Sequence, residues 1–152
     1  TLLVALIAGM KLWDNMDLNK LKQMLILHEK KKLWPYKCTA GKLTIGIGHN
    51  LEAKGISNAV ADLMYEEDVK EVIVDLHIIF ESFDNLPEQI QLVLADMRFQ
   101  LGGDGFIKFK KMIKAVNNSN WKEMIVQMKN SLWYKQTRNR AIDLINLVME
   151  CL

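Results

Sequence analysis

The sequence predicts a mainly helical α+β fold, in which a small N-terminal lobe with one β-hairpin is joined by a long helix to a helical C-terminal lobe. Three observations support this. Apolar residues recur at helical spacing over most of the chain. β-prone residues gather in one segment only, between residues 33 and 47. Turn-forming runs, such as Gly102-Gly103 and Asn117-Asn118-Ser119, divide the second half into short helices.

The N-terminal lobe is expected to consist of a helix followed by the hairpin. Asp17 can cap a helix whose apolar positions recur through residue 28, so Glu29 falls at its C-terminal end. The segments 33–36 and 43–47 are β-prone and flank a turn at Thr39-Ala40-Gly41. This order predicts that the chain leaves a helix at Glu29 and returns on a second strand.

The long helix and the helices after it have recognisable start and stop signals. Ser57 can cap an amphipathic helix that runs towards Phe80. Pro87 begins a helix that stops at Gly102-Gly103, and the next begins near Phe106. Asn120 with Glu123 resembles a capping box. A short turn of helix over 133–137 then precedes the last amphipathic stretch.

Length and composition favour one domain over residues 1–152. The chain has 152 residues, of which 50% are hydrophobic and 25% charged, as is usual for a globular protein. Cys38 and Cys151 are too few for a disulfide framework, and no histidine or cysteine has metal-ligand spacing. We therefore expect neither a metal nor a cofactor.

Residues 1–16 begin with the apolar run Leu2 to Met10. This run is much shorter than the ~20 residues that span a bilayer, so no stable membrane span is expected. It is either the remnant of a trimmed signal or membrane-anchoring segment, or an N-terminal helix that packs on the core.

Charge is distributed unevenly along the chain. Residues 50–96 carry eleven acidic residues against Lys54 and Lys70, whereas residues 108–140 carry nine basic residues against Glu123. A basic half suits a polyanion such as peptidoglycan, nucleic acid or an anionic membrane, although solvated helix faces would give the same composition.

Three side chains around the predicted hairpin can converge on one cleft: Glu29, Cys38 and Thr44. Hydrolysis of a glycosidic bond needs an acid that protonates the leaving oxygen, and a second group that activates water or attacks the anomeric carbon. Taken without its surroundings, the spacing favours the structural interpretation, a surface glutamate and a core cysteine.

The surroundings add a second level of information. Glu29, eight residues, Cys38, five residues and Thr44, followed by Ile45-Gly46-Ile47-Gly48-His49, resemble the active-site signature of phage-type lysozymes, which are glycoside hydrolases of family 24. A second block, Trp133-Tyr134-Lys135-Gln136-Thr137-Arg138-Asn139-Arg140-Ala141, resembles a downstream motif of the same family. The resemblance extends over residues 18 to 148.

The resemblance implies a lysozyme-like fold and hydrolysis of the β-1,4 bond between N-acetylmuramic acid and N-acetylglucosamine. It implies that Glu29 is the proton donor, that Cys38 acts as base or nucleophile where aspartate is more common, and that Thr44 orders the catalytic water. Arg140 would reach back to orient Glu29. The resemblance also implies an inverting reaction. Whether a thiol in place of the carboxylate preserves inversion is left open by the sequence.

Further residues take supporting roles by the same resemblance. Gly48 and His49 belong to the active-site support, with His49 in an ion pair with Asp68. Phe99, Gln100, Asn50 and Gln127 are the expected substrate contacts. The chain departs from the family in a shorter segment between His49 and Asp68, and in the residue types at Phe109 and Gln127.

The ionisation of the two catalytic groups is not set by sequence. Burial would keep the proton on Glu29, whereas an adjacent Arg140 would favour its carboxylate. A free thiol has a pKa near ~8.5, and Lys37, next to Cys38, is the sequence neighbour that could lower it.

Two other functions fit parts of the sequence. One is a peptidoglycan peptidase or amidase with Cys38 as nucleophile and His49 as base. The other is a non-catalytic module whose basic residues 108–140 bind a polyanion. As a lysozyme, the chain is expected to be a monomer that binds a peptidoglycan glycan strand and no nucleic acid. It is expected to act on the cell wall, and a phage-encoded enzyme would be held in the host cytoplasm or periplasm before release. A role in a lysing phage, in a phage tail or in a bacterial host is compatible with the sequence.

Overall fold

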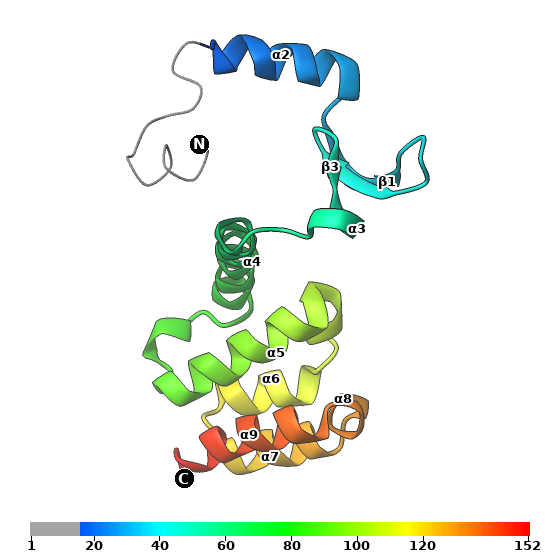
Figure 1. Cartoon of the computed structure of the whole chain (residues 1–152). Coiled ribbons are helices and arrows are strands. Elements are labelled where there is room, and N and C mark those ends of the chain that lie inside the picture. The colour runs from blue at the N-terminus through cyan, green and yellow to red at the C-terminus, as the bar shows by residue number, and fades with distance from the viewer. Residues whose placement is uncertain (1–15) are drawn as a thin grey trace, which may run out of the picture. The chain divides into compact units, whose positions relative to one another are not determined.

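The computed structural model describes residues 16–152 (Figure 1). The expectations for the apolar segment 1–16 therefore fall, apart from Met16, outside the described residues. Two compact units divide the chain, with their boundary in sequence between Asn58 and Ala59. The described residues are mainly helical, with one small antiparallel sheet. The predicted α+β class is confirmed.

The first unit begins with helix α2, Leu18–Glu29. The Asp17 carboxylate accepts hydrogen bonds of 3.0 Å from the backbone N–H groups of Asn19 and Lys20, as predicted for an N-cap. The helix stops immediately after Glu29, because Lys30 has φ 61° and ψ 147°. A residue with a Cβ rarely adopts this backbone conformation, so the chain changes direction sharply beside Glu29.

The sheet consists of β1 Lys32–Lys37, β2 Leu43–Gly46 and β3 His49–Asn50, in the order β1-β2-β3. The β1–β2 hairpin confirms the prediction. The third strand was not predicted, because two residues are too few to show an alternating pattern. Helix α3, Leu51–Lys54, follows at once, capped at Ala53 N–H by the Asn50 side chain.

The predicted long helix, α4 Asn58–Ile79, starts at the boundary and belongs to the second unit from Ala59 onwards. The 3₁₀ turn η1 Phe83–Asn85 follows it. The remaining helices are α5 Glu88–Phe106, α6 Lys110–Asn117, α7 Trp121–Lys129, α8 Leu132–Gln136 and α9 Arg138–Met149. Gly102, at φ 70° and ψ 168°, breaks α5 where the sequence predicted its end, but the chain resumes a helical turn to Phe106. The next helix therefore starts at Lys110 rather than near Phe106.

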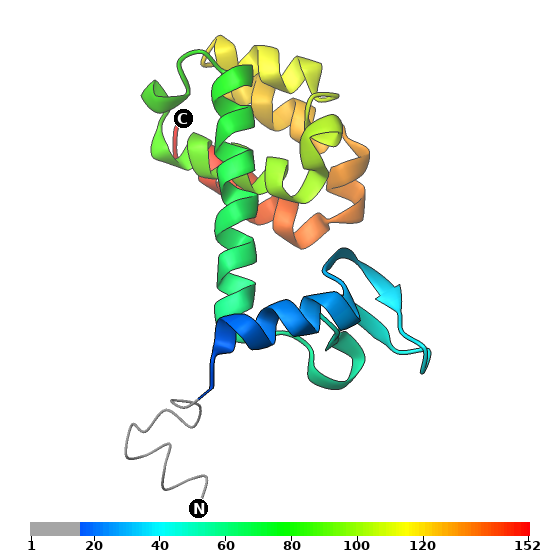
Figure 2. The same cartoon turned by 90° about the horizontal axis from the view of Figure 1, so that it is seen from above.

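The hydrophobic core of the described residues lies in the second unit, where α9 packs on α5, α7 and α8, and α6 packs on α7 (Figure 2). Ile90, Val93, Leu94, Met97 and Phe106 of α5 are essentially inaccessible to solvent. Methionines occupy several of the other fully buried positions: Met112, Met124 and Met128. Among the helices of residues 16–152, none combines the length and apolar character needed to cross a membrane.

Candidate active site

Glu29 and Gly48 lie against each other in the first unit. Gly48 has φ +68°, and a Cβ built on it would lie 3.2 Å from Glu29 Cδ and Oε2 and 3.3 Å from Cγ. The Glu29 side chain, exposed at the end of α2, therefore lies beside the glycine that follows β2. Any other residue at this φ would be strained, and its Cβ would press against Glu29. The position predicted to support the site thus directly contacts the predicted acid.

Thr44 occupies the middle of the sheet. It pairs with Tyr36 of β1 on one side and with Asn50 of β3 on the other. It is 3% exposed, the one buried polar residue among residues 16–152. Its hydroxyl donates to the Lys42 carbonyl oxygen at 2.9 Å. Burial on the central strand fixes this hydroxyl in place.

Cys38 lies where β1 enters the turn, and its thiol is half-buried. The turn is closed by hydrogen bonds from Cys38 N to Lys42 O at 3.0 Å and from Gly41 N to Cys38 O at 2.8 Å. The backbone N–H groups of Lys42 and Ala40 lower the pKa of the Cys38 thiol, and a hydrogen bond with the Thr44 side chain lowers it further. The shift comes from these groups rather than from the Lys37 ammonium.

His49 and Asn50 fold the end of the sheet onto α3. A His49 ring nitrogen, Nε2, donates to the Gly55 carbonyl oxygen. The Asn50 side-chain oxygen accepts from Ala53 N–H at 3.0 Å. Both side chains are therefore tied to the local fold. The predicted pair of His49 with Asp68 would join the two units and stays a prediction.

Arg140 pairs with an acid that the sequence gave no reason to choose. Its Nε lies 2.7 Å from Oδ1 of Asp96, across α9 and α5. This hydrogen bond uses Nε, so the two terminal nitrogens of the guanidinium take no part in it. The expected reach of Arg140 to Glu29 would join the two units and also stays a prediction.

The predicted substrate contacts in the second unit, which we call the helical unit, interact with neighbouring side chains. Phe99 is 43% exposed, with its ring centroid 6.4 Å from that of Tyr65. Gln100 accepts a 2.8 Å hydrogen bond from the Trp133 indole N–H, and Gln127 donates to Glu123 at 2.6 Å. The Trp133 block therefore fixes Gln100, a link across 33 residues of sequence that no local pattern indicates.

The phage lysozyme family model matches residues 27–146. The chain belongs to the phage lysozyme family. The predicted family and the predicted class of enzyme, a glycoside hydrolase, are confirmed. The match includes the Glu29, Cys38 and Thr44 segment and the Trp133 block, while the roles of the individual residues remain proposals.

This lysozyme is similar to proteins of quite different origin. It is 30% identical to "Probable T4-type lysozyme 2" of Dictyostelium discoideum, over 85% of this chain and 93% of that protein. It is 27% identical to "Probable T4-type lysozyme 1" of the same organism, over 86% and 94% of the two chains. It is also 25% identical to the pre-baseplate central spike protein of Enterobacteria phage T4, over 90% of this chain but only 28% of that protein.

In this lysozyme the helical unit contains a hollow of about 580 Å³ beside Gln127. Phe109 and Trp133, whose rings meet edge to face at 6.4 Å, line part of it. Lys108, Lys110 and Lys111 line it as well, and none of the three forms an ion pair within residues 16–152. The sequence pattern predicted neither the hollow nor the grouping of these three lysines at its edge.

Proposed function

We propose that this lysozyme hydrolyses the β-1,4 bond between N-acetylmuramic acid and N-acetylglucosamine in bacterial peptidoglycan. The observation that supports it best is the packing of the Glu29 carboxyl group against Gly48, in the same unit as Cys38 and Thr44. An acid beside a sheet that carries a thiol and a hydroxyl matches the two roles that glycosidic cleavage requires.

In this proposal Glu29 donates its proton to the leaving glycosidic oxygen. Its exposed position at the end of α2 lets a bulky polysaccharide approach the carboxyl group. The sharp backbone turn at Lys30 and the close contact with Gly48 limit where the carboxyl group can go, and such positioning is a large part of enzymatic rate enhancement. Arg140 would orient the same carboxyl group.

Cys38 supplies the second group, as base or as nucleophile. As a base, its thiolate takes a proton from water, and the water oxygen attacks the anomeric carbon while Thr44 holds that water. As a nucleophile, its sulfur forms a covalent bond to the anomeric carbon, and water then breaks that bond. The lowered pKa of the thiol raises the thiolate fraction that either role requires. NMR of the anomer first released separates inversion from retention.

The proposed substrate contacts are Asn50 in the first unit and Phe99, Gln100 and Gln127 in the second. Phe99 offers a partly exposed ring, and Gln127 lines the hollow of the helical unit. Gln100 and Asn50 use their side-chain oxygens for Trp133 and Ala53, which leaves their amide N–H groups as the donors for sugar hydroxyls. The enzyme would act as a monomer on the glycan strand of the bacterial cell wall.

The experiment is a turbidity assay on chloroform-treated Gram-negative cells. Glu29→Gln should lower the lysis rate by about 10²–10⁴-fold, the usual contribution of a general acid. Cys38→Ala should lose most activity, whereas Cys38→Asp should keep a substantial part. Cys151→Ala is the matched control, because it removes the other thiol. The assignment fails if Glu29→Gln or Cys38→Ala lyses cells at the wild-type rate.

Product analysis tests the two other functions. Purified peptidoglycan should yield new reducing ends and no new amino termini. New amino termini that depend on Cys38 would instead indicate a peptidase or amidase with His49 as base. Salt-dependent DNA binding without cleavage of peptidoglycan would indicate a binding module.

A further inference from the structure

An apolar bulge interrupts the edge strand of the sheet. Lys32 pairs with Gly46, but Tyr36 pairs with Thr44, so four steps along β1 match only two along β2. Leu33, Trp34 and Pro35 lie opposite the single residue Ile45, so β1 has two more residues than β2 over this stretch. We call these three residues the apolar bulge. Bulges re-aim side chains, and proline is accepted on edge strands, where its missing N–H is not needed.

The apolar bulge is unusually exposed. Trp34 is 83% and Leu33 is 74% accessible to solvent, and Pro35 is exposed as well. The hairpin that carries it extends away from the C-terminal end of α2 (Figures 1 and 2). Single exposed apolar residues are common, but a tryptophan, a leucine and a proline extruded together are not explained by the core.

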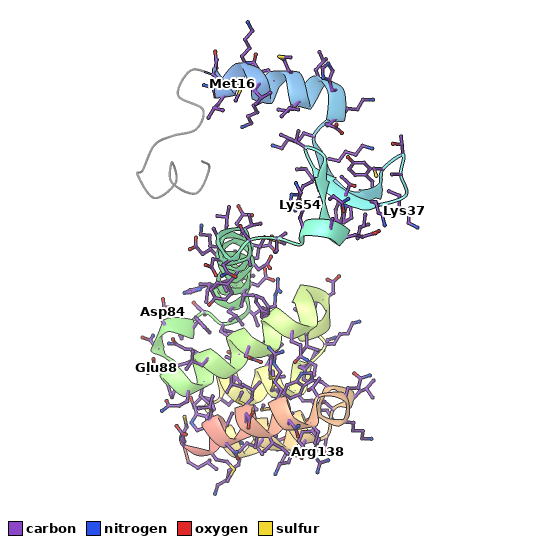
Figure 3. The ribbon with its side chains drawn as sticks, in the orientation of Figure 1. Met16, Lys37, Lys54, Asp84, Glu88 and Arg138 are labelled. Atoms are coloured by element: carbon purple, nitrogen blue, oxygen red, sulfur yellow. The ribbon has the colours of Figure 1, made fainter. Side chains whose placement is uncertain are left out.

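Lysines flank the apolar bulge in the sequence. Residues 30–51 contain five lysines and no acidic residue: Lys30, Lys31, Lys32, Lys37 and Lys42. Lys42 pairs with Glu52 at 3.3 Å, and the Lys32 ammonium lies 3.9 Å from the centre of the Tyr36 ring. The other three form no ion pair in the part of the chain that the structure describes. Figure 3 labels Lys37 on this hairpin.

We propose that the apolar bulge and its lysines bind the surface of an anionic phospholipid membrane. Tryptophan is favoured at the membrane interface, and lysines near the surface are attracted by anionic headgroups. An exposed apolar segment with lysines on both sides of it in the sequence satisfies both conditions. A glycan strand fits less well, because sugar rings stack on aromatic faces and gain little from Leu33 or Pro35. This binding is separate from the catalytic roles proposed above.

The test is co-sedimentation of the full chain with lipid vesicles. Vesicles of equal parts phosphatidylcholine and phosphatidylglycerol should bind the chain, whereas pure phosphatidylcholine vesicles should not. The triple change Lys30→Gln, Lys31→Gln and Lys37→Gln should weaken binding by about a hundredfold, because each lysine near an anionic surface contributes about fivefold. Added salt should weaken binding of the wild type as well.

The double change Leu33→Ser and Trp34→Ser tests the apolar bulge. It should lower vesicle binding at least about tenfold and leave cleavage of purified peptidoglycan intact, which shows that the chain is folded. Leu132→Ser is the matched control, because Leu132 is 67% exposed in the helical unit, and it should bind vesicles like the wild type.

Three results would overturn the proposal. The first is equal binding to neutral and anionic vesicles, or to neither. The second is undiminished binding by the double variant, which would place membrane attachment elsewhere in the chain. The third is loss of peptidoglycan binding rather than vesicle binding in that variant, which would make Trp34 a platform for sugar.

Discussion

The variant Gly48→Ala would strain the backbone and would also displace the Glu29 carboxyl group, and comparison with Gly46→Ala separates these two effects. At φ +68°, an alanine costs about 1–2 kcal/mol relative to glycine, which lowers Tm by about 2–4 °C for each kcal/mol in a chain of this size. Its Cβ would also lie 3.2 Å from two Glu29 atoms, so the carboxyl group must move by a few tenths of an ångström. Because a 1 Å misplacement costs about a hundredfold, we expect kcat to fall about threefold to tenfold.

Gly46→Ala is the matched control. Gly46 has the same φ of +68°, but a Cβ there would meet nothing within 4 Å. Both variants should therefore lose similar stability in thermal unfolding, and only Gly48→Ala should lose kcat on purified peptidoglycan. Equal kcat values for the two variants would refute the reasoning, since the contact with Glu29 would then have no catalytic consequence.

Three further predictions follow from the pKa shifts. Iodoacetamide near neutral pH should alkylate Cys38 faster than Cys151, because backbone N–H groups lower the pKa of Cys38, whereas burial raises the pKa of Cys151. Peptide mass spectrometry measures both alkylation rates, and faster alkylation of Cys151 would contradict the prediction. If the Cys38 thiolate is the base, kcat/KM falls as the pH drops through the thiol pKa, which lies below 9.0. Cys38→Asp should move this fall to the carboxyl range at ~4, and an unchanged pH profile would exclude the role of Cys38 as base. The Ile73 carbonyl and Asp84 raise the His77 pKa above 6.5, so the stability that the charged ring contributes is complete below pH 6.5 and lost as pH rises through the higher folded pKa; His77→Gln should flatten this dependence of Tm.

Local features of this lysozyme could be predicted because neighbouring residues decide them. Asp17 caps α2, Gly41 helps to close the hairpin turn, and Gly102 breaks α5 at the expected place. Each depends on hydrogen bonds or backbone conformations within a few residues. The spacing of Glu29, Cys38 and Thr44 and the Trp133 block likewise indicated the family from the sequence alone.

Other expectations failed where a property depends on the direction in which groups point in the folded chain. The cation of Lys37 suggested a cause for a reactive Cys38, but N–H groups oriented by the turn lower the pKa instead. Strand β3 was missed, although its pairing with β2 encloses Thr44. Such effects depend on directions in space, which a residue's type does not specify.

The family, the fold class and the candidate groups could be inferred from the amino-acid sequence, because periodicity, capping and motif spacing are properties of short segments. Three contacts became evident only in the folded chain: Gly48 against Glu29, Trp133 with Gln100, and Asp96 with Arg140. Those contacts join side chains 19 to 44 residues apart. Packing and hydrogen bonding choose such partners once the elements have formed, and no pattern along the chain records the choice.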